Sequence, residues 1–170
     1  MPTTARALGR LFDISSALGI VDLNTAANTG NRIHMKNYAG VTFVFFADAG
    51  TDDGDVAMDL NEHTAASGGT SQDLDIITTY HKKEETTLDG DETWTAVTQT
   101  AASEITAVAD SAEKENIYVV EVGAEQLSDG YEWISMNVPD LGQAKVGGVL
   151  AILWGLKAER TPANLPDPNA

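Results

Sequence analysis

Alternating apolar and polar positions run through most of the chain from residue 31 onward. In 56–60, Val, Met and Leu alternate with small or polar residues, which is the period-two pattern of a strand with one buried face. The stretch 41–46 is instead almost continuously apolar, which predicts a central strand buried on both faces. The stretch 145–156, apolar from residue 146 onward, predicts a last buried strand with a bend or bulge at its paired glycines.

Turn signals separate the predicted strands. Aspartate and glycine crowd together at 48–55, and Asp89-Gly90 lies between two strand patterns, which predicts a hairpin. About eight strands follow one another at intervals of roughly 10–18 residues, a spacing typical of all-β proteins. We therefore expect a single β-sandwich or jelly-roll-like domain over residues 20–160.

The two ends of the chain are predicted to lie outside this domain. Apolar residues in 1–19 fall at helical spacing, but Gly9 and Gly19 weaken a helix. We expect either a short helix or, preferably, an extended arm that becomes ordered against a partner. Three prolines in 161–170 predict a loose C-terminal tail.

Composition narrows the range of partners. The chain has 10 basic and 26 acidic residues, a formal net charge of −16, so it should repel nucleic-acid phosphates and anionic membrane surfaces. We expect neither nucleic acid nor membrane as a partner. The longest apolar run, 146–156, falls short of the roughly 20 residues that a membrane-spanning helix needs. Three roles fit the acidic charge: solubility, contact with a basic partner surface and cation binding.

Residues that could carry chemistry do not form a recognisable catalytic motif. The sequence has no cysteine and no Gly-x-Ser-x-Gly around a serine nucleophile. His34, His63 and His81 are too far apart along the chain to match a local metal-ligand motif. Carboxylates crowd 48–55 and 89–92, where weak cation binding is the alternative to a solvated turn. We predict a protein that is not an enzyme and has no cofactor or metal.

Exposed aromatic side chains would suit a binding surface. Trp133 alternates with Ile134, so one of the two should face away from the core. Trp133 is therefore the candidate for an exposed aromatic surface, either for sugar binding or for oligomer contacts. Trp154, in the apolar last strand, is expected in the core.

The order of several short segments resembles that of small virion structural proteins of tailed bacteriophages, of the kind that decorate or cement the capsid. These segments extend over most of the chain, between residues 20 and 160. They are 21–23 (VDL), 33–37 (IHMKN), the apolar strand 41–46 with the acidic turn behind it, 55–64, 67–70, 93–95, 119–122, 125–127 and the closing strand that ends at Glu159-Arg160.

The resemblance implies a β-rich protein on the outer surface of the phage head. It would bind the major capsid protein and copies of itself, often as a homotrimer. Arg6, Arg10, Leu11 and Phe12 in the N-terminal arm are the candidate capsid contacts, because two basic residues there stand against an acidic body. A neck or tail subunit of the same virion and a carbohydrate-binding β-sandwich are the alternatives.

Overall fold

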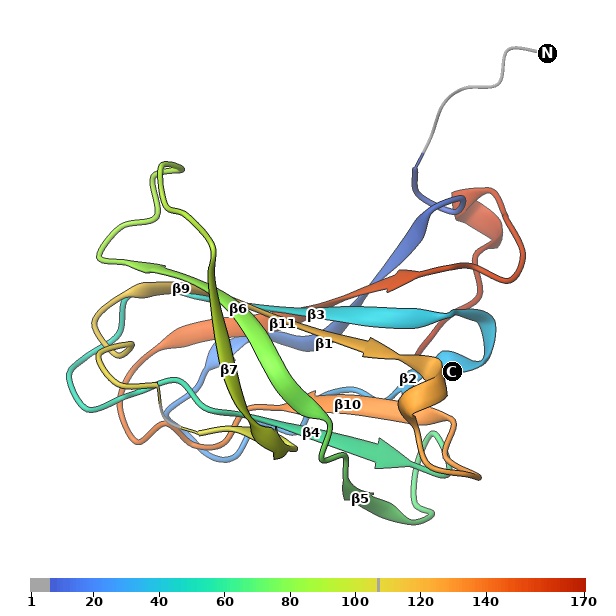
Figure 1. The fold of residues 1–170 in the computed structure, drawn as a ribbon, viewed down its shortest axis with the longest axis horizontal. Coiled ribbons are helices and arrows are strands. Elements are labelled where there is room, and N and C mark those ends of the chain that lie inside the picture. Colours follow the sequence, from blue (N-terminus) through green and yellow to red (C-terminus); the bar gives the residue numbers. More distant parts are fainter. Residues whose placement is uncertain (1–6, 107) are drawn as a thin grey trace.

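The computed structural model describes residues 7–106 and 108–170, which form two antiparallel β-sheets packed face to face (Figure 1). The predicted all-β, sandwich-like class is confirmed. The described strands are more numerous than predicted: β1 (Phe12–Asp22), β2 (Ile33–His34), β3 (Gly40–Ala47), β4 (Met58–His63), β5 (Ser71–Asp73), β6 (Ile77–Glu85), β7 (Thr95–Ala102), β8 (Glu104–Ile105), β9 (Glu115–Gly123), β10 (Trp133–Asn137) and β11 (Val146–Trp154).

Three short 3₁₀ helices complete the described elements: η1 (Met35–Asn37), η2 (Ala124–Gln126) and η3 (Pro162–Asn164). Within 7–106 and 108–170, no helix has the length and apolar character that crossing a membrane requires.

Strand β3 lies inside a six-stranded sheet with the order β1-β11-β3-β9-β6-β7. Its branched and aromatic residues favour an extended backbone, and it pairs with β11 on one side and β9 on the other. Phe43 and Phe45 are buried, whereas Phe46 is 56 % exposed. The prediction that this strand is buried on both faces is therefore wrong for the single chain, because the second sheet covers only one face.

The second sheet has the order β2-β10-β4-β5, with β8 pairing to β4 at one end. Its apolar residues alternate inward and join those of the first sheet in one core, which accounts for the period-two signal in the sequence. The largest fully buried apolar side chains of this core are Leu23, Ile33, Tyr38, Phe43, Phe45, Leu60, Ile105, Tyr118, Ile134, Met136 and Leu153.

The segment predicted as an arm or short helix contributes a strand instead. From Phe12 onward it is β1, which pairs along its length with β11 as an edge of the six-stranded sheet. Asp13 points inward, and its buried carboxylate accepts a hydrogen bond from the Tyr38 hydroxyl at 2.8 Å. As a strand, this segment pairs its backbone N–H and C=O groups with those of β11. Residues 1–6 lie outside the described part.

The C-terminal residues are docked rather than loose, which corrects the second prediction about the ends. The carbonyl of the buried Pro168 accepts a hydrogen bond from the His34 backbone N–H at 2.7 Å. The Asn169 side chain donates to the Arg32 carbonyl and accepts from the Ser15 hydroxyl. The tail thus connects β1 to the residues around β2. Proline has no backbone N–H to donate, but its carbonyl still accepts a hydrogen bond, as that of Pro168 does here.

A buried lysine fixes the loop that precedes β9. Lys145 is 2 % exposed, and its Nζ donates to the carbonyls of Ser111, Ala112 and Lys114 at 2.9–3.2 Å. Burial lowers the pKa of Lys145, although nearby carboxylates, Asp48 first among them, act in the opposite direction. Three carbonyls gathered round one ammonium group hold this end of the sandwich in a defined shape.

Candidate interaction surface

The outer face of the six-stranded sheet carries an apolar surface, which we call the sheet face. The strand register aligns Leu150 of β11 with Val44 of β3, and Val44 in turn with Val119 of β9. In the next row, Ile152 pairs with Ile14 of β1. These side chains point away from the core, because the buried residues occupy the alternate positions of the same strands.

Several large apolar side chains of this face lie open to solvent. Ile20 is 83 % exposed, Phe46 56 %, Leu150 51 % and Ile14 48 %. Trp154, expected in the core, is 37 % exposed at the end of β11, so that prediction is wrong. Scattered exposed leucines are ordinary on a protein surface, but a contiguous apolar set on one sheet face marks an interaction surface.

A groove of about 320 Å³ runs along the sheet face, and we call it the sheet groove. Leu18 and Ile20 line one side, Val44 and Phe46 the other, and Leu150 lies between them. The groove forms where β1 bulges away from regular pairing with β11, as the register shifts on both sides of Leu18 show. A bulge of this kind bends the strand and re-aims its side chains, which explains the high exposure of Ile20.

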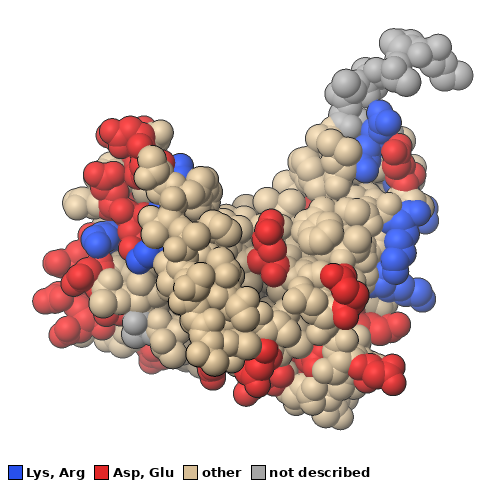
Figure 2. Space-filling view, in the orientation of Figure 1, with Lys and Arg blue, Asp and Glu red and all other residues tan. Residues whose placement is uncertain are grey.

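The sheet face is hollowed between two projections. In Figure 1 the hairpin that joins β6 to β7 rises at one side, and the start of β1 with the chain beyond β11 rises at the other. Figure 2 shows the surface dipping between them, with mostly uncharged residues along the dip and one acidic group at its floor. Such a concave apolar surface fits a convex partner better than a flat one.

The other sheet presents a different outer face, made of polar side chains that bond to one another. His63 Nδ1 lies 2.7 Å from Ser71 Oγ, and His63 Nε2 lies 2.9 Å from Ser135 Oγ. The Asn61 side-chain amide donates to Asp73 at 2.9 Å. These groups satisfy each other within the chain, and His63 and Ser135 are buried, so these residues form no exposed apolar surface.

The Ser71–His63 contact places a hydroxyl beside an imidazole, the pairing that nucleophilic catalysis uses. Burial, with the positive charge of Arg32 acting in the same direction, lowers the pKa of His63 to about 4. A general base works best with a pKa near the working pH, so a neutral His63 with this pKa abstracts protons poorly at pH 7. Arg32 also donates to Ser71 and to the carbonyls of Ala65 and Gly68. The contact therefore serves to hold the loop 64–70 against the sheet.

The three histidines do not come together. His34 and His63 flank Trp133 in the small sheet, and the His34 ring stacks on the indole at 4.1 Å between centroids. His81 belongs to β6 in the other sheet. Trp133 itself is only 7 % exposed, so the prediction of an exposed aromatic surface at this residue is wrong. Trp133 and Ile134 are both buried because His34 and neighbouring chain cover the outward side of β10.

Charge is divided between the two ends of the sandwich. Acidic residues are most numerous at the end where β3 stops and β11 starts, where Lys82, Lys83 and Lys114 also lie, and four basic residues gather around the start of β1 together with Glu159 (Figure 2). Exposed carboxylates of the acidic end include Asp22, Asp48, Asp52, Asp53, Glu85, Asp89, Asp91, Asp110 and Glu113. The basic end carries the exposed Arg10, Lys36, Lys157 and Arg160. This division gives the molecule a direction along the strands.

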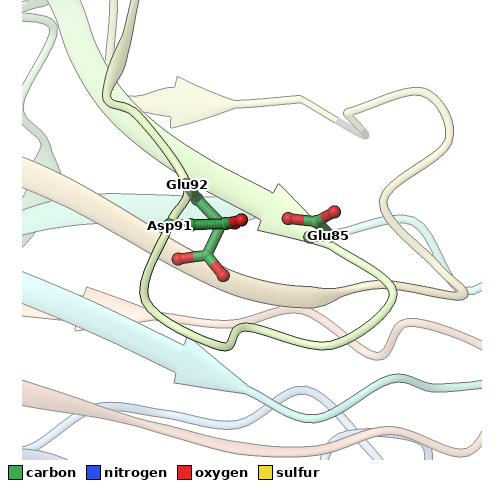
Figure 3. A group of neighbouring side chains, drawn as sticks. All are labelled: Glu85, Asp91 and Glu92. Carbon is green, nitrogen blue, oxygen red and sulfur yellow. The ribbon is translucent and has the colours of Figure 1, made fainter.

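Within the acidic end, Glu85, Asp91 and Glu92 bring one carboxylate oxygen each to within 4.8 Å of the others (Figure 3). One carboxylate oxygen of Glu92 accepts hydrogen bonds from the backbone N–H groups of Asp89 and Gly90, at 2.6 and 3.2 Å. Exposed carboxylates often gather in turns without an ion. The cluster alone therefore gives no reason to replace the solvated turn with a cation site.

The predicted arm residues fall at the edge of the sheet. Leu11 is 68 % exposed, Phe12 is half-buried at the start of β1, and Arg10 forms an exposed ion pair with Glu159 at 3.0 Å. Arg6 lies outside the described residues. Sequence reasoning missed Ile14, Ile20 and the other residues of the sheet face, because it assigned β1 to an arm and the outer side of β11 to the core.

Comparison with known proteins adds no relative. No protein-family model matches the chain, and no curated protein matches its sequence.

Proposed function

We propose that this chain is a structural protein of a tailed-phage virion, which decorates the outer surface of the head and stabilises contacts between major capsid subunits. The observation that carries the proposal is the sheet face, a contiguous exposed apolar surface on a strongly acidic β-sandwich. An assembly protein needs complementary surface rather than reactive groups, and this surface is the feature of the described fold best suited to docking. The resemblance of the segment order to capsid decoration proteins supplies the virion setting.

The pattern of burial supports a role in assembly over a role in sugar binding. Carbohydrate modules expose aromatic rings in positions where a sugar can stack on them. Trp133, the predicted candidate, is buried against His34. The apolar side chains that the sheet face does expose are mostly aliphatic, and these pack against protein surfaces rather than stack on sugar rings.

The test is binding of the purified full chain to heads of the phage that encodes it, prepared without this protein. We expect the wild-type chain to sediment with the heads and to raise the temperature at which they release DNA. The variant Ile14→Ser, which changes the sheet face outside the sheet groove, should reduce binding at least tenfold. Trp94→Ser, which removes an apolar side chain of similar exposure on the β6–β7 hairpin, is the matched control and should bind as the wild type does.

Electron cryo-microscopy of complete virions locates the protein directly. Density on the capsid surface supports the proposal. Density confined to the portal vertex or the tail would replace it with the neck or tail alternative, and failure to bind heads together with absence from virions would refute both.

A further inference from the structure

The sheet groove requires an occupant that is convex, apolar at its tip and basic at its base. Its lining is apolar, and its rim at the β11 start carries the exposed carboxylates of Asp22 and Asp48 on either side of Val146. Two copies of the sheet face placed against each other would leave their hollows facing, so a symmetric face-to-face contact fills neither. The occupant must project.

The chain itself offers two projections with exposed apolar side chains. One is the β6–β7 hairpin with Trp94, but this hairpin also carries Asp89 and Asp91 and would bring more negative charge to an acidic rim. The other is the turn Leu8–Leu11, which we call the N-terminal turn. It exposes Leu8 and Leu11 and holds Arg10 between them, where Arg10 forms its exposed ion pair with Glu159.

The N-terminal turn is built firmly enough to act as a preformed insert. Gly9 donates its N–H to the Phe12 carbonyl at 2.8 Å, and Leu11 donates to the Ala7 carbonyl at 2.7 Å. The Gly9 carbonyl accepts from the Arg160 N–H at 2.8 Å, so the turn is anchored to the chain beyond β11. Gly9 has a φ of +81°, and a Cβ there would lie 2.3 Å from the Arg160 carbonyl oxygen, so the close approach requires glycine. A preformed turn loses little conformational entropy on docking.

We propose that the sheet groove of one copy receives the N-terminal turn of a second copy, with the basic end of one subunit against the acidic end of the next. This inference rests on the proposed function, since it specifies how the decorating protein associates with itself. Leu8 and Leu11 enter the groove beside Phe46 and Leu150, and Arg10 and Arg160 approach the carboxylates of the rim. Because the contact joins two different surfaces, it repeats from subunit to subunit, and of the two arrangements that such a contact allows, a ring and an open filament, we propose the ring.

The arrangement makes a specific prediction about mixed variants. Leu11→Asp removes the insert but leaves the groove, and Leu150→Asp removes the groove but leaves the insert. Both positions are exposed, so neither change should unfold the chain. By native mass spectrometry at tens of micromolar, the wild type should be a closed oligomer and each variant alone a monomer. An equimolar mixture should give a heterodimer, which contains one intact groove–turn contact.

Two further variants keep the test decisive. If Leu150→Asp fails to fold, Ile20→Asp takes its place in the test. Ile20 is the most exposed residue of the groove, and its substitution should also give a monomer. Trp94→Asp should leave the oligomer intact. Raising the salt concentration from about 50 to 500 mM should weaken the wild-type oligomer, because salt screens the contact between the charged ends.

The proposal is overturned if the wild type is monomeric, if Leu11→Asp alone still assembles, if Trp94→Asp dissociates the oligomer instead, or if the mixture gives no heterodimer. Binding to heads separates this result from the proposed function. A monomeric wild type that still binds heads, and loses binding with Leu150→Asp, would leave decoration standing and assign the groove to a capsid protein.

Discussion

Acid should destabilise this protein through one buried histidine, and the size of the effect follows from its surroundings. His63 is 6 % exposed and lies between Ser71 and Ser135, with one ring nitrogen donating and the other accepting. Protonation would make both ring nitrogens donors, and each serine hydroxyl can rotate so that its oxygen accepts the hydrogen bond. The cost arises instead from charging a buried ring near Arg32, which lowers the pKa of His63 from 6.5 to about 4.

A folded-state pKa below that of the unfolded chain means that the unfolded state binds the proton first as pH falls. The stability from neutral His63 is therefore complete above pH 6.5 and is lost as pH falls toward 4. Each pKa unit of difference corresponds to about 1.4 kcal/mol, so the loss approaches about 3 kcal/mol at pH 4. For a domain whose total stability is on the order of 5–15 kcal/mol, this is a large share.

The assay compares urea unfolding of the wild type and His63→Gln at pH 7.5, 6, 5 and 4. Many carboxylates also titrate in this range, but they do so in both proteins, so the difference between the two free energies of unfolding isolates His63. We expect the free energy of unfolding of the wild type, relative to that of His63→Gln, to fall by about 3 kcal/mol between pH 7.5 and pH 4. Parallel curves that stay within about 0.5 kcal/mol would refute the reasoning. An NMR titration of the His63 ring in the wild type checks the pKa directly.

Three further predictions concern packing. Lys145→Met should cost at least about 2 kcal/mol in urea unfolding, because three carbonyls lose their donor, whereas the exposed control Lys157→Met should change stability by less than about 0.5 kcal/mol. Trp133→Ala should cost about 3–5 kcal/mol by the same measurement, and a near-neutral result would contradict its burial against His34. Gly40→Ala should displace the Trp154 ring, since the added Cβ would lie 2.1 Å from it; the expected result is a changed tryptophan emission spectrum and a loss of about 1–3 kcal/mol, and an unchanged spectrum would contradict the contact.

Local patterns in the sequence were sufficient where a structure depends on neighbouring residues. The alternation in 56–60 and the Asp89-Gly90 signal predicted β4 and the β6–β7 hairpin, although Asp89-Gly90, with a positive φ at Gly90, lies within the longer connection 86–94 and does not join the strands directly.

Long-range pairing was beyond such patterns. The apolar residues of 1–19 fit a helix or an extended chain equally well, and the choice is made by β11, which lies more than a hundred residues away in sequence. Trp133 was expected to face outward because alternating residues of a strand point to opposite faces. Both faces of β10 are nevertheless covered, one by the core and the other by His34. Burial by a segment that is distant in sequence leaves no periodic signal at the buried residue.

The errors at β3 and β11 have a different origin, and they bear on the function. Both sequences have the continuous apolar character of strands covered on two sides, yet in the single chain only the inner side is covered. A strand whose outer face met water would gain solubility from polar residues there. The outer positions of β3 and β11 instead hold Phe46 and Leu150 beside the sheet groove. The pattern of these strands is what a sheet covered on both faces requires, which is the condition that an assembled protein would meet and an isolated chain does not.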